Sequence, residues 1–273
     1  MPLASAPSIE VERWMGTPGQ SYAGMSVEGL GVGLANSILT IAFDRPDKRN
    51  AITYGMYEAI TRMLASASDD DAVRAILFTG RGEIFTAGHD VSGFARGLSL
   101  KVEEKPSFGF MQVLSTFPKP VIAAVNGDAV GIGATMLFHC DFVHAASHAR
   151  LKFPFMQMGL IPEFGTTLLG PRLFGHKAAM DLFMLDGWCS AERAVELGIA
   201  NRTVPAGDLM DSALSTGQAV AALSPEAVRE TKRLMKEPVG KRTAAAILAE
   251  AHAFHELLRT DFVRELLAHR IGA

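Results

Sequence analysis

The chain has few cysteines and no surplus of positive charge. Its 273 residues contain two cysteines, Cys140 and Cys189, too few for a disulfide framework or for a paired zinc-binding Cys-x-x-Cys pattern. Lysine and arginine number 26 against 29 aspartates and glutamates, so the charge balance does not favour a nucleic-acid partner. The cysteine content fits a reducing compartment.

Long hydrophobic runs are also missing. The longest apolar region, 121–137, is interrupted by Asn126, Gly127 and Asp128 and is too short to span a bilayer. The first residues lack the basic start and apolar stretch of a secretory signal and the arginine-rich character of a mitochondrial transit peptide. These absences predict a soluble, cytoplasmic protein that has no membrane partner.

Hydrophobic residues make up 48% of the chain, which is enough for one large core. Apolar runs predict strands over 37–43, 73–79, 119–125, 142–145 and 149–153. An early helix is predicted over 51–66, with Asn50 as its N-cap. Further helices are predicted near 177–186, 190–197, 207–222 and 225–236, and from 242 to the end. Strands that alternate with helices, followed by helices alone, predict an α/β fold with a largely parallel sheet and a helical C-terminal part.

Two short stretches carry the strongest chemical signal. Residues 84–90 (IFTAGHD) and 125–133 (VNGDAVGIG) are each an apolar strand that runs into a turn of small residues opening a helix. The first N–H groups of a helix have no partner within it and can hold an anion. Two such turns that face each other would aim two donors at one oxygen, which is the arrangement of an oxyanion hole.

An oxyanion hole suits chemistry at a thioester, because removal of the proton beside the carbonyl places negative charge on one oxygen. The reaction also needs a base that can return the proton elsewhere. Glu163, within the apolar segment 159–167 (GLIPEFGTT), is the candidate. Burial would raise its pKa and make proton transfer efficient near neutral pH.

Other motifs carry less weight. Gly29, Gly31 and Gly33 imitate a dinucleotide-binding loop, but the third glycine is misplaced and we expect no strand before them. No Gly-x-Ser-x-Gly nucleophile motif is present. His252 and His255 lie one turn apart on an expected helix, where a solvated face is favoured over a metal site. We therefore expect no metal.

The chain resembles the enoyl-CoA hydratase/isomerase (crotonase) superfamily from about residue 38 to residue 270. The resemblance rests on four blocks in the right order and spacing: Asp44-Arg45-Pro46 with Arg49-Asn50-Ala51-Ile52, Phe85-Thr86-Ala87-Gly88-His89-Asp90, 119–127 (KPVIAAVNG) and Gly159-Leu160-Ile161-Pro162-Glu163. The motifs are closest to those of Δ3,Δ2-enoyl-CoA isomerases.

The resemblance implies a ClpP/crotonase-like spiral of ββα turns with a helical C-terminal region used for trimer formation. It divides the chain into a poorly ordered arm over 1–25, an α/β core over 26–205 and a helical region over 206–273. The protein is then expected to form a homotrimer or homohexamer. Its substrate would be an acyl-CoA thioester, and no cofactor would be bound permanently.

The family's motifs also assign roles to individual residues. The oxyanion donors would be the backbone N–H groups of His89 and Ile132. The loop with Arg45, Lys48 and Arg49 would contact the CoA nucleotide. The remaining substrate-binding positions implied by the resemblance are Ala87, Gly88, Asp90, Val91, Gly131, Gly133, Thr135 and Phe155. From the residues alone, Asp90 could be catalytic but suits a helix N-cap equally well, and the cap is favoured.

The departures from the family pattern point to the reaction. Hydratases of the family use two glutamates to activate water, and the matching positions here are Thr135 and Phe155. Glu163 matches the single catalytic carboxylate of the isomerases. An isomerase is therefore favoured, in which Glu163 takes a proton from C2 and delivers it to C4. A hydratase that adds water to a 2-enoyl-CoA and a non-catalytic acyl-CoA-binding subunit remain alternatives.

Overall fold

The computed structural model describes residues 22, 24–90, 94–185 and 187–271. Most of the predicted arm over 1–25, and the predicted site residue Val91, lie outside the described residues. The strands are β1 (Leu30–Ala35), β2 (Ile38–Phe43), β3 (Ala75–Gly80), β4 (Ile84–Thr86), β5 (Val121–Val125), β6 (Asp128–Val130), β7 (Phe142–Ala146), β8 (Arg150–Lys152), β9 (Cys189–Ser190) and β10 (Arg202–Val204).

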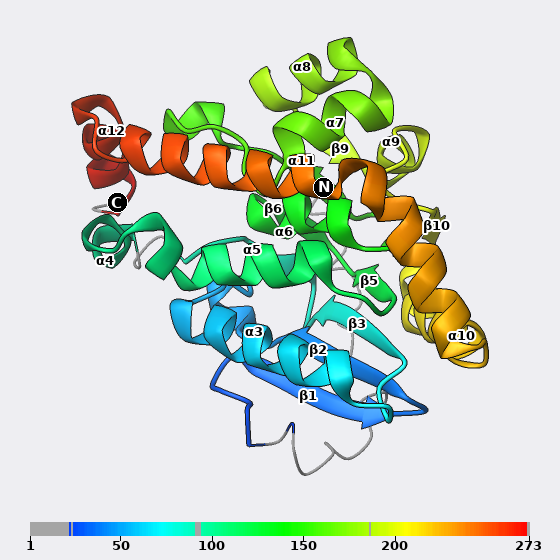
Figure 1. Cartoon of the computed structure of the whole chain (residues 1–273). Coiled ribbons are helices and arrows are strands. Elements are labelled where there is room, and N and C mark those ends of the chain that lie inside the picture. Colours follow the sequence, from blue (N-terminus) through cyan, green and yellow to red (C-terminus); the bar gives the residue numbers. More distant parts are fainter. Residues whose placement is uncertain (1–21, 23, 91–93, 186, 272–273) are drawn as a thin grey trace.

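Helices surround the strands and dominate the second half of the chain (Figure 1). The α-helices are α3 (Tyr54–Asp69), α4 (Phe94–Ser99), α5 (Pro106–Thr116), α6 (Ile132–Thr135), α7 (Thr166–Phe174), α8 (His176–Met184), α9 (Ala191–Glu196), α10 (Leu209–Ala221), α11 (Pro225–Leu257) and α12 (Asp261–Ile271). Short 3-10 helices are η1 (Pro46–Lys48), η3 (Val102–Glu104), η4 (Met136–His139), η5 (Met156–Met158) and η6 (Ala206–Asp208).

The strands form two sheets that the chain visits in turn. One sheet has the order β1-β2-β3-β5-β7-β10 and the other has the order β4-β6-β8-β9. Strands β3, β5 and β7 of the first sheet are each followed directly by a strand of the second, β4, β6 and β8. This repeated step, with helices between the repeats, is the predicted spiral of ββα turns, and the predicted mixed α/β class with a helical C-terminal part is confirmed.

The central strands are continuous apolar runs in the sequence because all of their residues are buried. Every residue of β2, β3 and β5 is buried, and these strands pair in parallel with their neighbours in the order β2-β3-β5-β7. Helix α10 packs against these strands. Because successive side chains of a strand point to opposite faces, burial of every residue means that both faces of the sheet are covered. The carboxyl ends of β3 and β5 consequently lie side by side, and each leads into one of the two signature turns.

The sequence prediction missed the first strand. Strand β1 contains Gly31 and Gly33 and pairs antiparallel with β2, so these glycines belong to a hairpin. Asn36 and Ser37 form its turn, with φ of 49° and 62°, as a two-residue hairpin turn requires. The strand predicted from residue 37 therefore begins at Ile38. Two glycines in a short apolar segment gave too weak a signal for a strand.

Two helix boundaries also differ from expectation. Helix α3 begins after Thr53, whose hydroxyl accepts a 3.3 Å hydrogen bond from the N–H of Met56, so the prediction of Asn50 as N-cap was wrong. The expected break over 237–241 is absent, because α11 continues through Pro238. Helix α11 bends along its length in Figure 1, as an internal proline permits, and packs against α5 and α7. Helix α7 itself was not predicted.

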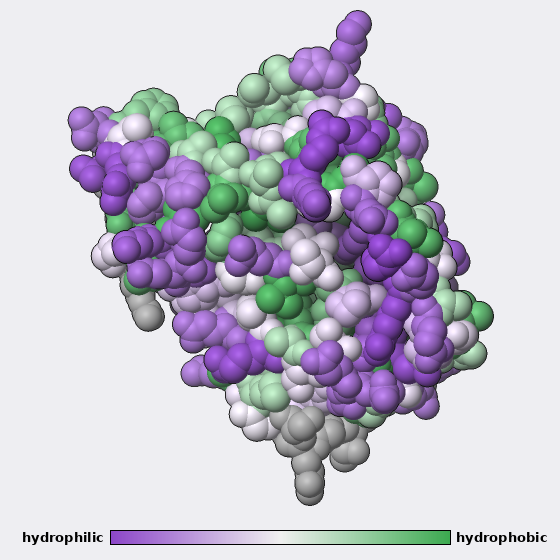
Figure 2. All heavy atoms as spheres, viewed as in Figure 1, coloured by the Kyte–Doolittle hydropathy of each residue, from purple (hydrophilic) through white to green (hydrophobic). Residues whose placement is uncertain are grey.

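The described residues include no helix long and apolar enough to cross a membrane. Figure 2 shows polar and apolar atoms mixed over the viewed face, with apolar atoms gathered where α11 crosses it. Leu234, Met235 and Leu248 of α11 are exposed, and so are Met180 and Met184 of α8. These helices therefore present apolar side chains that the single chain does not cover.

Candidate active site

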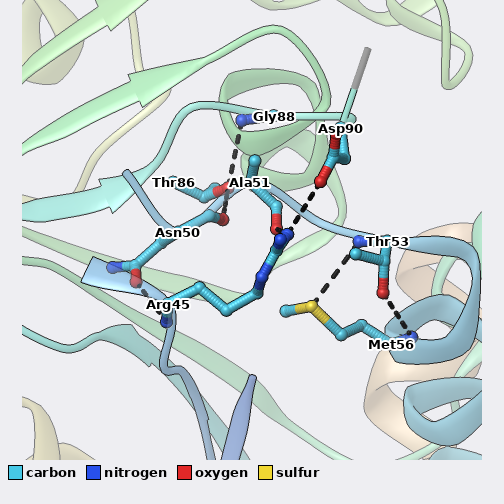
Figure 3. A network of polar contacts seen from close by, with 8 residues as sticks. All are labelled: Arg45, Asn50, Ala51, Thr53, Met56, Thr86, Gly88 and Asp90. Atoms are coloured by element: carbon cyan, nitrogen blue, oxygen red, sulfur yellow. Dashed lines mark hydrogen bonds and ion pairs between the residues drawn. The ribbon is translucent and has the colours of Figure 1, made fainter. Parts of the chain in front are cut away.

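The first signature turn is held by a network of polar contacts around Asn50 (Figure 3). The buried side chain of Asn50 accepts from the N–H of Arg45 at 2.9 Å and donates to the carbonyl of Ile84 at 2.7 Å. The Thr86 hydroxyl donates to the Asn50 carbonyl and accepts from the N–H of Gly88. Asn50 itself sits in the left-handed region at φ 57°. Its role is to fix the end of β4 rather than to begin a helix.

This network sets the direction of the His89 amide. Residues Ile52 and His89 form a parallel bridge, in which the N–H of Ile52 bonds the carbonyl of Gly88 and the N–H of Asp90 bonds the carbonyl of Ile52. Successive N–H groups of an extended strand point to opposite edges. The N–H of His89 therefore points away from Ile52.

The second signature turn lies directly against the first. A Cβ built on Gly88 would lie 2.6 Å from the carbonyl oxygen of Val130 and 3.6 Å from the backbone nitrogen of Ile132. Gly131, at φ 57°, ends β6 and caps α6, so Ile132 is the first helical residue and its N–H has no partner within the helix. The geometry brings together the two turns whose amides the sequence predicted as donors.

A cavity of about 500 Å³ opens at this junction. Ala87, His89, Gly131 and Ile132 line it from the two turns, and Glu163 lines it from the loop before α7. Apolar side chains from α5, α11 and the segment around η5 form much of the remaining wall: Phe108, Met111, Phe155, Met158, Phe254 and Leu258. The cavity thus combines the Glu163 carboxyl group, the two signature turns and an apolar wall.

The loop that carries Glu163 has an unusual backbone. Phe164 and Gly165 both adopt left-handed conformations, with φ of 69° and 75°. A phenylalanine seldom adopts this conformation unless its surroundings demand it. Phe164 is fully buried, its ring stacks 4.2 Å from that of His139, and its carbonyl accepts a 2.6 Å hydrogen bond from His139 Nε2. These contacts fix the direction in which Glu163 leaves the loop.

The surroundings of Glu163 favour its protonated form. Burial, and next the negative charge of Glu250, raise its pKa to about 8, while Lys105 acts in the opposite direction. Its charge in turn adds to the burial that holds the pKa of Tyr57 well above the usual value. A carboxyl group with a pKa near neutrality can both accept and donate a proton at physiological pH.

The His89 side chain packs rather than protrudes. Its ring stacks on Tyr57 with centroids 5.6 Å apart and lies 5.1 Å from the ring of Tyr54. Burial lowers the pKa of His89 to about 4, so the imidazole is neutral near pH 7. The His89 ring therefore contributes packing, and the polar group that this residue offers to the cavity is its backbone N–H.

The predicted CoA-loop residues separate into different environments. Arg49 lines the cavity, whereas Lys48 is exposed in η1. The Arg45 guanidinium donates to the Ala51 carbonyl at 2.7 Å and pairs with the Asp90 carboxylate at 2.9 Å. Asp90 therefore ties the first signature turn to the loop that carries Arg45. Residues 91–93 lie outside the described residues, so the helix N-cap role suggested for Asp90 stays a prediction.

The positions that match the water-activating glutamates of hydratases carry no carboxylate. Phe155 lines the cavity. Thr135 is fully buried in α6, where its hydroxyl lies 3.4 Å from the Ile132 carbonyl. Gly133 is packed against Thr86, since a Cβ there would lie 2.4 Å from the Thr86 methyl group. Among the described residues that line the cavity, Glu163 is the only carboxylate.

Sequence reasoning missed several residues of the site. Lys105 lines the cavity and its ammonium lies 2.8 Å from His255 Nδ1, so the prediction of a solvated histidine face was wrong for His255, which is buried. Glu250 reaches the Glu163 loop from α11. Trp188 also lines the cavity, with the Arg150 guanidinium 4.2 Å above its ring. No motif marks these residues, because each joins the site from a distant segment.

No group of three or more His, Cys, Asp and Glu side chains among the described residues is arranged to hold a metal ion. Both cysteines are unpaired thiols, Cys189 buried and Cys140 partly so. The chemistry available at the cavity therefore consists of backbone donors, a carboxyl group and nearby cationic and aromatic side chains.

Comparison with known proteins finds similar sequences over most of the chain. A family model described as enoyl-CoA hydratase/isomerase matches residues 33–269. Enoyl-CoA delta isomerase 2 of Homo sapiens is 32% identical over 238 residues, 85% of this chain but only 60% of that longer protein. Enoyl-CoA hydratase ACTT3 of Alternaria alternata is 30% identical over 232 residues, 84% of this chain and 78% of the relative.

A solved structure, that of Pseudomonas aeruginosa OdaA, superimposes with a TM-score of 0.87 at 40% identity. The match covers 90% of this chain and all of that one. The similar proteins therefore include both an isomerase and a hydratase on one fold, and the assignment between these reactions depends on the residues in the cavity.

Proposed function

This chain belongs to the enoyl-CoA hydratase/isomerase family, and we propose that it moves the double bond of a 3-enoyl-CoA thioester to the 2-position. The observation that carries the proposal is that Glu163 is the single carboxylate among the described residues that line the cavity. Glu163 lies beside the two signature turns, and a phenylalanine and a threonine occupy the positions of the hydratase glutamates. A proton shuttle needs one carboxylate, whereas activation of water in this family uses two.

The proposed reaction begins when the Glu163 carboxylate removes a proton from C2 of the substrate. The electron pair of the broken C–H bond moves into the thioester, and the resulting dienolate carries its charge on the carbonyl oxygen. The backbone N–H groups of His89 and Ile132 stabilise that oxyanion, and one such donor is worth about 2.7–4 kcal/mol. The protonated Glu163 then delivers its proton to C4, which leaves the double bond conjugated with the carbonyl.

Substrate binding follows from the lining of the cavity. The apolar side chains of Phe108, Met111, Phe254 and Leu258 suit an acyl chain. Arg49 and the exposed Lys48 suit contact with the CoA nucleotide. We assign Arg45 to support of this loop, since its guanidinium is bonded within the chain. The CoA thioester is the substrate in this proposal and is not a resident cofactor.

Replacement of Glu163 by glutamine tests the proposal. The variant keeps the volume of the side chain but removes the base, so we expect formation of conjugated 2-enoyl-CoA from 3-enoyl-CoA to fall at least about 100-fold. Binding of a saturated acyl-CoA, measured by calorimetry, should remain within a few-fold of wild type. The exposed Glu237→Gln variant is the matched control. Retained turnover in Glu163→Gln would refute the role of this carboxyl group.

Hydration of a 2-enoyl-CoA is the second candidate, because a relative of similar identity is named a hydratase. It would require Glu163 to act together with another group, because the described residues that line the cavity include no second carboxylate. Binding without turnover on either substrate class would instead favour a non-catalytic acyl-CoA-binding subunit.

We also propose that the protein assembles as a homotrimer or a pair of trimers in the cytoplasm. The exposed apolar side chains on α7, α8 and α11 support assembly, since burial against a second copy would remove them from water. Light scattering should give three or six times 29.2 kDa, and a monomer in solution would refute this proposal.

A further inference from the structure

Two charged side chains of opposite sign, carried by different elements, lie near Glu163 and act on its charge. Glu250 extends from α11 to the loop that carries Glu163: its carboxylate accepts hydrogen bonds from the N–H of Gly165 at 2.5 Å and of Thr167 at 3.0 Å. The Thr167 hydroxyl donates to the same carboxylate at 2.5 Å. Glu250 therefore caps the start of α7 and is held within a few residues of Glu163.

Lys105 comes from a different part of the chain. It lines the same cavity as Glu163 at the start of α5, and its ammonium donates to Nδ1 of the buried His255 at 2.8 Å. An ammonium group has no acceptor, so Nδ1 of His255 is unprotonated in this contact. Burial lowers the pKa of His255, which keeps the imidazole neutral. The neutral histidine thus holds the ammonium group of Lys105 in place and adds no charge of its own.

One helix positions both groups. Glu250 and His255 are five residues apart on α11, and each is buried. The Glu250 side chain holds the loop after Glu163, while His255 holds Lys105. The cationic side chains of Arg49 and Lys152 also line the cavity. Burial raises the pKa of Tyr57 and lowers those of His89 and His139, so these three side chains carry no charge near neutral pH. Arg259, beyond α11, acts on Lys105 rather than on Glu163 directly.

We propose that Lys105 and Glu250 are opposing positioning residues that together set the proton affinity of Glu163, with α11 as their common support. The cation favours the ionised form of Glu163 that accepts the proton, and the buried carboxylate favours the protonated form that returns it. The effect on kinetics rests on the proposed function, in which Glu163 is the proton shuttle. The effect of the two charges on the proton affinity of Glu163 does not, because both side chains are present in the protein without substrate.

The proposal predicts shifts of opposite sign from two single substitutions. Lys105→Met removes the positive charge at similar length, so the rise of kcat/KM with pH should move to higher pH by about one unit. Glu250→Gln keeps an acceptor for the α7 amides but removes the negative charge, so the same rise should move to lower pH by about one unit. The double variant should return close to the wild-type profile.

The direct measurement is an infrared titration of the Glu163 carboxylic acid band in the protein without substrate. The band is identified by its loss in Glu163→Gln and is followed in each variant. Lys101→Met and Glu237→Gln, which change exposed residues on the same two segments, are the controls and should leave the midpoint unchanged. If Lys105 and Glu250 only maintained the structure, their substitution would lower activity at every pH and would not shift the midpoint in opposite directions.

The outcomes separate this inference from the proposed reaction. Opposite shifts of the infrared midpoint support the inference even if the protein does not turn over 3-enoyl-CoA. Absence of that turnover would count against the proposed isomerase reaction and not against the inference. Shifts in the same direction, or unshifted midpoints in folded variants, would overturn it. Should Glu250→Gln fail to fold, Lys105→Met still decides, because an unchanged midpoint there contradicts the proposal.

Discussion

Individual residues in the cavity are held in conformations that only specific side chains tolerate. Gly88 has φ 86° and lies so close to the second signature turn that a Cβ would meet the Val130 carbonyl. Phe164 occupies the left-handed region because its ring and carbonyl are both held by His139. The backbone at the proposed oxyanion hole is therefore held by contacts within the fold, which is a requirement for electrostatic stabilisation by amides.

Substitution of Gly88 by alanine should separate the two turns. The added methyl group would lie 2.6 Å from the Val130 oxygen, so one turn must shift and the two amide donors would no longer converge. We expect kcat to fall by about 100-fold or more, with the circular dichroism spectrum retained. Gly109→Ala in α5 is the control, because its Cβ meets nothing within 4 Å. Wild-type kcat in Gly88→Ala would contradict the oxyanion hole.

The raised pKa of Glu163 also predicts how stability depends on pH. The folded protein holds the proton of Glu163 up to about pH 8, whereas the ordinary glutamate value is 4.5. Between these values the folded state binds more protons than the unfolded state, so the free energy of unfolding falls as pH rises. The fall from this group is at most about 5 kcal/mol, since one pKa unit corresponds to about 1.4 kcal/mol.

Denaturant unfolding of wild type and Glu163→Gln at several pH values isolates this contribution. The glutamine variant should gain stability relative to wild type between pH 5 and pH 8 and show no further gain above that range. A constant difference between the two proteins across these pH values would mean that the pKa of Glu163 is not raised in the fold.

At the scale of secondary structure, the site depends on elements that meet only after the chain has folded. The parallel strands β3 and β5 end side by side and deliver the two turns, whereas α11 delivers Glu250 and His255. The strands were predictable because they are continuous apolar runs bounded by small residues. The helix contacts were not, because Glu250 reaches a partner 85 residues away and His255 one 150 residues away.

The same contrast applies to helix boundaries. The sequence around Pro238 and Gly240 predicts a break, yet α11 runs on because its following turns bury Thr243, Ile247 and Glu250 against the core. Tertiary packing there outweighs a local cost of about 3 kcal/mol for an internal proline. Asn50 was predicted as a helix cap because its side chain suits that role, but the same hydrogen-bonding capacity is used across strands.

The end of α3 offers a stability test. The buried ammonium of Lys119 donates to the carbonyls of Ala67, Asp70 and Val73 at 2.6–2.8 Å, where α3 ends and β3 begins. Lys119→Met would leave these acceptors unpaired, so we expect a loss of about 3 kcal/mol in the free energy of unfolding. The exposed Lys241→Met is the control. Equal stability of the two variants in urea unfolding would refute this role.

For the molecule as a whole, the family fold and the position of the cavity follow from the four sequence blocks, and Glu163 could be named from its apolar setting. The supporting charges could not, since a lysine before a helix and a glutamate within one are ordinary surface residues in sequence terms. The proposed reaction depends on this combination, because relatives of this family are named both isomerases and hydratases.

The most direct test of the central claim follows the fate of solvent atoms. A straight-chain 3-enoyl-CoA is incubated with the protein in 18O-labelled water. The products are separated by chromatography, and their masses are measured by mass spectrometry. We predict a conjugated 2-enoyl-CoA of unchanged mass and without 18O, formed by wild type and not by Glu163→Gln. A 3-hydroxyacyl-CoA that carries 18O as the main product, or equal turnover by the glutamine variant, would contradict the account.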